Sequence, residues 1–283
     1  MNGILLIDKE KDWTSNDVVI YLKKSLSINK VGHLGTLDPI ATGVLPITLG
    51  KATRLFDLFL EKFKTYIAEF EFGYSTDTLD STGEKTEINS RIPDLTEILR
   101  VLPIFEGEIQ QIPPQFSAKK VCGKRAYEYA REGKTIELKP RTVIIRKCKC
   151  ITYNNKILTL EIECSAGTYV RAVGRDIAEK ICTKCTMIGL CRTKVGSFDI
   201  KSCVQVRDVN KQNIDKLVIS CENALINFEK LIVDNILVEK LLNGCPINID
   251  NKKDGYYKLY KNEKFVGLTK VERNSAKMYL TLI

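Results

Sequence analysis

KVGHLGTLDPIATGVLP, residues 30–46, interrupts the hydrophobic periodicity on either side of it. Glycine and proline recur through residues 29–50, at Gly32, Gly35, Pro39, Gly43, Pro46 and Gly50. Residues of these two types favour tight bends, so the sequence predicts one long loop over residues 29–50. Loops of that length in a compact domain usually have a function, which makes this stretch the first candidate for a site.

Asp38 is the single carboxylate of this stretch, and it stands between Leu37 and Pro39. Proline fixes its own φ and pushes the preceding residue toward extended conformations, so Asp38 should be presented rigidly. A catalytic carboxylate and a turn aspartate that bonds its own backbone are both compatible with this pattern. The local pattern alone favours the turn.

Spacing argues against several functions that are common for glycine-rich loops. A phosphate-binding P-loop at Gly50 and Lys51 would need Ser or Thr where Ala52 stands and glycine where Leu45 stands. His33 is the only histidine, and no G-x-S-x-G motif accompanies it, which disfavours a serine or cysteine hydrolase. A metal site built from several histidines is impossible.

The ten cysteines are scattered along a chain of 283 residues, which favours reduced thiols over a disulfide framework. A zinc site made of Cys148, Cys150, Cys182 and Cys185 is disfavoured, because the first two lie in an alternating, strand-like run. The apolar run Ile4–Ile7 is too short for a signal peptide, and no stretch reaches the ~20 apolar residues of a membrane span. We therefore expect a cytoplasmic protein.

Hydrophobic periodicity predicts both strands and helices around the loop. The predicted strands cover residues 3–8, 66–72, 141–153 and 156–164, the last two as a hairpin around Asn154 and Asn155. The predicted helices are one capped by Thr14 or Ser15 and reaching Leu26, one near 55–60, one over Leu95–Leu102 and one over Val170–Ile181. Without regular βαβ alternation, this order predicts an α+β fold with a largely antiparallel mixed sheet flanked by helices. After residue 228 the pattern changes to one that favours mostly strands. This change predicts two domains, 1–228 and a small β-rich domain over 229–283.

The net charge of +9 is concentrated in residues 117–149, which hold eleven basic and three acidic residues and therefore carry +8. Concentrated positive charge attracts polyanions, because phosphate backbones release counterions on such a surface. Nucleic acid is the leading partner, and a solvated lysine-rich face is the alternative.

Gly32 to Pro46 resembles the signature G-H-x-G-x-L-D-P-x-A-T-G-x-L-P of the TruB family of tRNA pseudouridine synthases. Further segments resemble the same family in order: GILLIDK (3–9), TS (14–15), GKATR (50–54), KTY (64–66), TDTLDSTG (76–83), IPPQFSAKKVCGKRAYEYAREG (112–133), CSAGTYVR (164–171) and RTKVGSF (192–198). The C-terminal segment is weakly similar to the family's PUA-like RNA-binding domain. The resemblance implies the pseudouridine synthase fold for residues 1–228.

The resemblance also implies roles for individual residues. Asp38 matches the family's catalytic aspartate, Tyr66 the aromatic residue that stacks on the target base, and Arg171 the arginine that pairs with the aspartate. The remaining matches are Asp80, which steadies that arginine, Leu190, a wall of the pocket, His33, which packs against the RNA loop, and Lys9 and Arg54, basic residues that approach the substrate. From the local pattern alone, a core position is favoured for Tyr66, and Arg171 could be a surface residue of its helix.

The implied reaction is the isomerisation of uridine 55 in the T-loop of tRNA. The bond between ribose C1′ and uracil N1 breaks, the base turns, and C1′ joins C5, so no redox step occurs and no cofactor or metal is expected. A carboxylate kept ionised by an arginine can serve as nucleophile or base at the sugar. The target base must leave the RNA stack, and an aromatic side chain can receive it.

The sequence departs from the family at Glu10, Asp12, Ala166 and Cys191, where proline, glycine, lysine and arginine are usual. These changes surround the expected chemistry and bear on RNA affinity. We expect a monomer that acts on the T-arm of tRNA, without membrane, guide RNA or protein partner. The alternatives are a guide-RNA-dependent relative that acts on ribosomal RNA and an RNA-binding module without chemistry.

Overall fold

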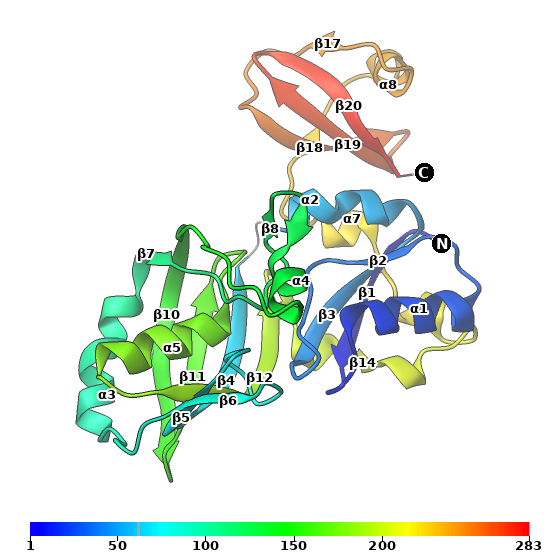
Figure 1. Ribbon diagram of the computed structural model, residues 1–283. Coiled ribbons are helices and arrows are strands. Elements are labelled where there is room, and N and C mark those ends of the chain that lie inside the picture. Colours follow the sequence, from blue (N-terminus) through cyan, green and yellow to red (C-terminus); the bar gives the residue numbers. More distant parts are fainter. Residues whose placement is uncertain (61–62, 283) are drawn as a thin grey trace.

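A large mixed sheet dominates the computed structural model, which describes residues 1–60 and 63–282 (Figure 1). Its strand order is β14-β1-β3-β12-β4-β11-β10-β7, with β2, β13 and β15 paired to β3, β12 and β1. Neighbours on this path are antiparallel except for β1–β14 and β3–β12. The prediction of an α+β fold with a largely antiparallel mixed sheet is confirmed.

The strands of this sheet are β1 (Gly3–Lys9), β2 (Val31–His33), β3 (Thr42–Leu49), β4 (Lys64–Phe72), β7 (Gly107–Gln111), β10 (Arg141–Asn154), β11 (Ile157–Cys164), β12 (Cys185–Val195), β13 (Phe198–Asp199), β14 (Val204–Gln205) and β15 (Ile219–Ser220). Two short hairpins stand apart from it: β5 (Tyr74–Thr76) with β6 (Lys85–Ile88), and β8 (Lys120–Val121) with β9 (Lys124–Arg125). The halves of the large sheet join where β3 meets β12, through the pairs Thr42–Cys191 and Gly43–Arg192.

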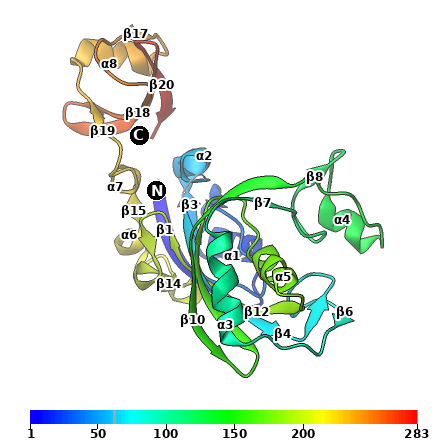
Figure 2. The same ribbon diagram turned by 90° about the vertical axis from the view of Figure 1, so that its left-hand side faces the viewer.

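The α-helices are α1 (Ser15–Leu26), α2 (Phe56–Leu60), α3 (Leu95–Val101), α4 (Ala126–Arg131), α5 (Val170–Lys180), α6 (Ile214–Leu217), α7 (Cys221–Ala224) and α8 (Asn235–Leu242). Short 3-10 segments cover Gly50–Leu55, Leu102–Phe105, Ile200–Ser202 and Val206–Asp208. Figure 2 shows α1, α3 and α5 on the same side of the sheet. Their buried side chains form one hydrophobic cluster with the strands that they cover.

Helix α1 begins and ends as its sequence predicts. The Thr14 hydroxyl accepts from Asp17 N at 3.0 Å, and the Asp17 carboxylate accepts from Thr14 N at 2.8 Å, which completes a capping box. The helix ends at Leu26 and is capped by Ser27, whose φ is 56°. Its predicted apolar face is buried, at Val18, Val19, Leu22 and Leu26.

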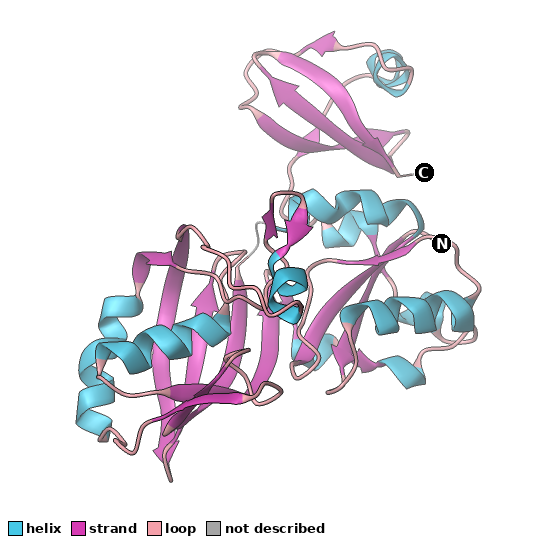
Figure 3. Ribbon diagram, viewed as in Figure 1, coloured by secondary structure: helices cyan, strands magenta, loops and turns pink. Residues whose placement is uncertain are grey.

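Strand β4 alternates as predicted, with Tyr66, Ala68, Phe70 and Phe72 buried on one face. The predicted hairpin is β10 and β11, joined by Asn155 and Lys156 with φ of 48° and 62°. Positive φ at both turn residues matches the twist of the flanking strands. Figure 3 shows this long hairpin as part of the central sheet.

The prediction of one loop over residues 29–50 is wrong, because β2 and all of β3 lie within it. Gly43 permits a close approach of strands rather than a bend, since a Cβ there would lie 2.3 Å from Arg192 O. Proline has no N–H to donate, but at Pro46 this costs no strand pairing, because β2 has already ended on that side of β3. The Pro46 carbonyl still accepts from Leu34 N at 2.9 Å. The irregular part is reduced to residues 34–41.

Residues 230–281 form a second sheet with strand order β16-β18-β19-β20-β17. Its strands are β16 (Lys230–Leu231), β17 (Ile247–Asn248), β18 (Gly255–Lys261), β19 (Lys264–Glu272) and β20 (Ser275–Thr281), with α8 packed on the sheet. This sheet confirms the expectation that the chain after residue 228 is rich in strands, and Figure 1 shows it above the large sheet. Leu268, Leu280 and Leu282 belong to the same buried cluster as Ile4 and Leu6 of β1, so the two parts share a packed surface. Within the described residues, no helix is both long and apolar enough to span a bilayer.

Candidate active site

Asp38 lies in the irregular segment that links β2 to β3, and hydrogen bonds fix the backbone around it. The Ser15 hydroxyl accepts from Leu37 N at 2.8 Å and donates to Leu37 O at 3.2 Å. Asp38 O accepts from Ala41 N at 3.0 Å, which closes a turn. Leu37 is buried beside it, so the Asp38 carboxylate is held at the surface by a rigid backbone.

Arg171, the second residue of α5, joins three segments of the chain. Its Nε lies 3.1 Å from Asp38 Oδ2, and its Nη1 lies 3.3 Å from Asp80 Oδ2. Nη1 also donates to Thr78 O at 2.8 Å, and Nη2 donates to Phe116 O at 3.2 Å. The Arg171 side chain is 8% exposed and the Asp38 side chain 38% exposed, so a buried cation holds a carboxylate that solvent can reach.

Asp80 is tied down by its own turn. Its Oδ1 accepts from the Thr78 hydroxyl at 2.9 Å, from Thr82 N at 3.0 Å and from the Thr82 hydroxyl at 2.5 Å. Its carbonyl accepts from the Thr76 hydroxyl at 2.7 Å. The segment TDTLDSTG therefore wraps one carboxylate, whose other oxygen faces Arg171.

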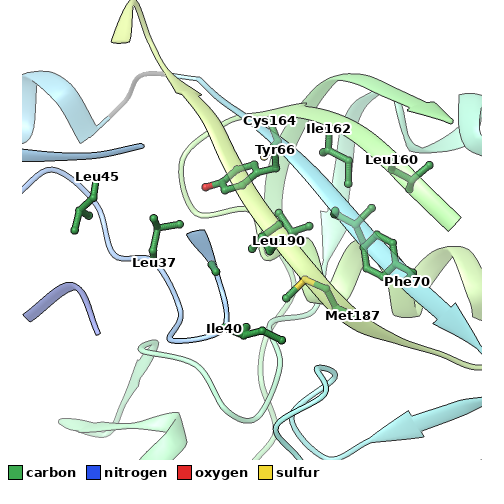
Figure 4. Close-up of a cluster of buried hydrophobic side chains, with 14 of the residues drawn as sticks. Leu37, Ile40, Leu45, Tyr66, Phe70, Leu160, Ile162, Cys164, Met187 and Leu190 are labelled. Carbon is green, nitrogen blue, oxygen red and sulfur yellow. The ribbon is translucent and has the colours of Figure 1, made fainter. Parts of the chain in front are cut away.

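Tyr66 on β4 and Leu190 on β12 form an apolar wall. Both are nearly buried, and Leu190 pairs with Ala68, two residues along β4 from Tyr66. Figure 4 shows them in one cluster with Leu37, and the Tyr66 hydroxyl points toward the side of the loop that carries Leu37. Burial raises the pKa of Tyr66, so its phenol is neutral at pH 7.

His33 lies on β2, opposite Ile47, and is half-buried. Its Nδ1 has no hydrogen-bond partner among the residues that the structure describes. Burial and then the charge of Arg192 lower the pKa of His33, so the imidazole is neutral at physiological pH.

The resemblance led us to expect that Lys9 approaches the substrate, and in the structure its ammonium group is occupied by three backbone carbonyls. The side chain is fully buried, and Nζ donates to Glu10 O at 2.9 Å, Trp13 O at 2.6 Å and Pro39 O at 3.3 Å. Burial lowers the pKa of Lys9 to about 8, against the opposing charge of Asp38. Through its hydrogen bond to Pro39 O, Lys9 thus stabilises the loop that carries Asp38. Arg54, in contrast, is exposed at the end of the 3-10 segment Gly50–Leu55.

Arg192 on β12 was not assigned a role from the sequence, and the structure places it directly beneath the loop. It is only 1% exposed and donates to Val44 O at 2.8 Å, Gly35 O at 3.1 Å and Thr36 O at 3.3 Å. The motif RTKVGSF contains it, but no local pattern distinguishes a buried strand arginine from an exposed one.

Residues 112–140 lie between the sheet strands β7 and β10 and form an insertion that carries most of the basic residues of segment 117–149. The hairpin β8–β9 turns at Cys122 and Gly123 and leads into α4. Arg125 and Arg131 lie 5.9 Å and 5.3 Å from the ring centre of Tyr127. Since Phe116 O accepts from Arg171, this cationic and aromatic surface adjoins the Asp38 site.

A groove of about 880 Å³ lies away from this site and contains none of the predicted site residues. Thr65 lines it, and because side chains alternate along a strand, the groove opens on the face of β4 opposite Tyr66. Its walls carry both signs of charge, with Lys147 and Glu161 paired at 2.5 Å. In the described part of the chain, no three His, Cys, Asp or Glu side chains are grouped closely enough to hold a metal ion.

Comparison with known proteins adds to this geometry. Residues 23–170 match the family described as TruB family pseudouridylate synthase, N-terminal domain. The chain is 37% identical over 290 residues to tRNA pseudouridine synthase B of Clostridium tetani, covering 100% of both chains. It is 41% identical over 273 residues to tRNA pseudouridine synthase B of Caldanaerobacter subterraneus subsp. tengcongensis, covering 95% of this chain and 94% of that protein.

Solved structures with a similar fold include a Cbf5-Nop10-Gar1 complex, with a TM-score of 0.75 and 21% identity, and an H/ACA RNP bound to a substrate RNA containing 2′-deoxyuridine, with a TM-score of 0.74 and 21% identity. Each comparison covers 99% of this chain and 85% of the other chain. At this identity the similarity is one of fold.

Proposed function

The chain belongs to the TruB family of pseudouridylate synthases and is an isomerase of uridine in tRNA, and we propose that Asp38 acts on the ribose of uridine 55 in the T-loop. The ion pair between Asp38 and Arg171 carries this proposal. It combines a carboxylate that solvent can reach with a buried cation that fixes the position of the carboxylate, which is what a nucleophile or base at the sugar requires.

The residues around Asp38 support a pocket for a base that has left the RNA stack. Tyr66 offers an aromatic face and Leu190 an apolar wall, both fixed in paired strands. Stacking on an aromatic side chain contributes about 1–3 kcal/mol per base. His33 is proposed to pack against the RNA loop, and Arg54 to approach the backbone, because it is exposed close to the end of β3.

Asp38 has two chemical routes available. As a nucleophile it bonds to C1′ while the C1′–N1 bond breaks, and as a base it removes the C2′ proton. In the nucleophilic route the bond between Asp38 and C1′ breaks as the turned base joins C1′ through C5. In the base route the C1′–N1 bond breaks as the C2′ proton leaves, and C2′ regains that proton once C1′ has joined C5. In both routes the C5 proton leaves and N1 gains a proton, so the product is an isomer of the substrate. Asp80 is proposed to steady Arg171 throughout, because its Oδ2 lies 3.3 Å from Nη1.

The insertion 112–140 and the second sheet are proposed to bind the RNA backbone. Lys119, Lys120, Arg125 and Arg131 are exposed on the insertion beside the Asp38 site. Phosphate contacts of this kind position a substrate without reading its sequence. We assign residues 1–228 to the catalytic domain and 229–283 to a small PUA-like RNA-binding domain, since the second sheet has its own hydrophobic core.

We further propose that the protein acts on the T-arm of tRNA as a cytoplasmic monomer, without guide RNA or protein partner. The support is that relatives named tRNA pseudouridine synthase B match essentially the full chain. An assay with purified components tests the absence of a guide, and sedimentation of the purified protein tests the monomer.

Tritium release from tRNA transcripts labelled at uridine C5 tests the function, because isomerisation replaces the C5 hydrogen. Wild-type protein without guide RNA is expected to release the label, and Asp38→Asn to release none. If wild type releases no label, the standalone synthase is excluded. If Asp38→Asn releases label as fast as wild type, Asp38 is not the catalyst. A tRNA that lacks its T-arm should not react.

A further inference from the structure

Arg192 and Tyr66 are direct cross-strand partners in the antiparallel pair β12–β4. Side chains at such positions leave the sheet on the same face, with Cβ atoms roughly 4.5–5.5 Å apart. The Arg192 guanidinium and the Tyr66 hydroxyl therefore share one buried space. A side-chain hydrogen bond from Arg192 and its charge both counteract the rise that burial causes in the Tyr66 pKa.

The other donors of Arg192 point to the loop that carries Asp38. Nη2 and Nη1 donate to the carbonyls of Gly35 and Thr36, three and two residues before Asp38, and Nε donates to Val44 O after it. A guanidinium has five N–H donors in a planar fork, which suits it to several acceptors at once. One side chain thus binds the backbone on both sides of Asp38 and also interacts with the Tyr66 side chain.

Stability alone does not account for a cation at this position. Arg192 has no ion pair with a carboxylate in the described ranges 1–60 and 63–282, and its charge lowers the pKa of Lys9, Lys64 and His33. A buried cation costs desolvation free energy, and an apolar side chain of similar volume is often at least as stable. The position therefore has a use other than packing.

We propose that Arg192 is a positioning residue for the isomerisation, holding the Tyr66 phenol at a fixed separation from the loop that presents Asp38. The proposal rests on the roles of Asp38 and Tyr66 proposed above. The flipped base contacts Tyr66 while the ribose of the same nucleotide contacts Asp38. The distance between the Tyr66 phenol and the Asp38 carboxylate must therefore match the distance between the base and the ribose of one nucleotide. A misplacement of about 1 Å costs on the order of a hundredfold in rate.

Arg192→Lys tests the proposal, because lysine keeps the charge and lacks the planar fork. Single-turnover tritium release at saturating protein should fall roughly ten- to hundredfold, while the Kd for tRNA changes by less than about threefold. Arg91→Lys is the matched control: Arg91 also donates to a backbone carbonyl, Ile181 O, at the far end of α5 from Arg171, and this variant should react like wild type. An unchanged rate in Arg192→Lys overturns the proposal, as does a loss of affinity that accounts for the whole effect.

Tyr66→Phe breaks the same hydrogen bond from the other side and leaves the three hydrogen bonds to the loop intact, so it serves if Arg192→Lys does not fold. The same loss of rate with retained affinity is expected, and a wild-type rate contradicts the proposal.

NMR of protein labelled with [¹³Cζ]tyrosine follows the interaction without any reaction, with Tyr66→Phe assigning the signal. The pKa of Tyr66 should rise further in Arg192→Gln, because the charge that counteracts burial is removed. An unchanged pKa overturns the interaction. If wild type releases no tritium, the proposed function fails, whereas this measurement still decides whether Arg192 holds Tyr66.

Discussion

Arg171 and Asp80 form a buried ion pair, with 3.3 Å between Nη1 and Oδ2 and side chains that are 8% and 6% exposed. Asp38 contacts the same guanidinium, yet it is far more exposed. The two carboxylates are thus separated by environment: one orients the arginine from inside the protein, and the other is left able to meet a substrate.

Asp80→Asn should lower both activity and stability, because Arg171 loses one of its two charged partners. We expect tritium release to fall roughly ten- to hundredfold, since Arg171 no longer holds Asp38 in place. The free energy of unfolding in urea should fall by about 1–3 kcal/mol. Glu84→Gln, an exposed change in the same turn, is the control, and equal losses in the two variants would show that Asp80 has no special role.

Ser15→Ala removes both hydrogen bonds that hold Leu37, the residue before Asp38. The free energy of unfolding should fall by about 1–3 kcal/mol, because two buried backbone groups lose their partner. Ser25→Ala in the same helix is the matched control, since the Ser25 hydroxyl has no hydrogen-bond partner among the described residues and its loss should cost little. Chemical denaturation of the pair measures the difference, and tritium release should fall only in Ser15→Ala.

Lys64 makes stability depend on pH, because burial lowers its pKa from 10.5 to about 8. Between these values the unfolded chain binds the proton more often than the folded protein does, so this contribution to stability increases as the pH rises. The free energy of unfolding of wild type minus that of Lys64→Met should therefore increase from pH 7.5 to pH 9.5. Urea titrations at both values check this, and a difference that stays constant or shrinks contradicts the assignment.

Arg125→Ala with Arg131→Ala should weaken tRNA binding without slowing the reaction of bound tRNA. The slope of log Kd against log salt concentration should change by roughly 1 for each phosphate that is no longer neutralised. Filter binding at several salt concentrations measures the slope. Lys180→Ala removes an exposed charge at the last residue of α5 and is the control, and an equal effect there would mean that the insertion is not the RNA surface.

Local patterns predicted those elements whose signals are complete within a few residues. The alternation from Tyr66 to Phe72 and the cap at Thr14 depend only on near neighbours, and both are confirmed. The predicted loop failed at Gly43 because the demand on that residue comes from Arg192, about 150 residues away in the sequence. The sequence alone does not distinguish a glycine required for the close approach of two strands from one required for a turn.

The candidate site shows the same division. The resemblance indicated which residues belong together, while periodicity alone treated Tyr66 as core and Arg171 as a surface residue. Lys9 and Arg192 could not be placed from sequence, since basic residues are ordinarily exposed and only the carbonyls that surround these two make burial tolerable. Those carbonyls come from segments that become neighbours only after folding.

The buried cluster shared by strands β1 and β20 has a consequence for folding during synthesis. Ile4 and Leu6 are synthesised long before Leu280 and Leu282, which belong to the same cluster. Until they emerge, one face of β1 is incompletely covered. Strand β1 therefore reaches its final packing only after β20 has been synthesised.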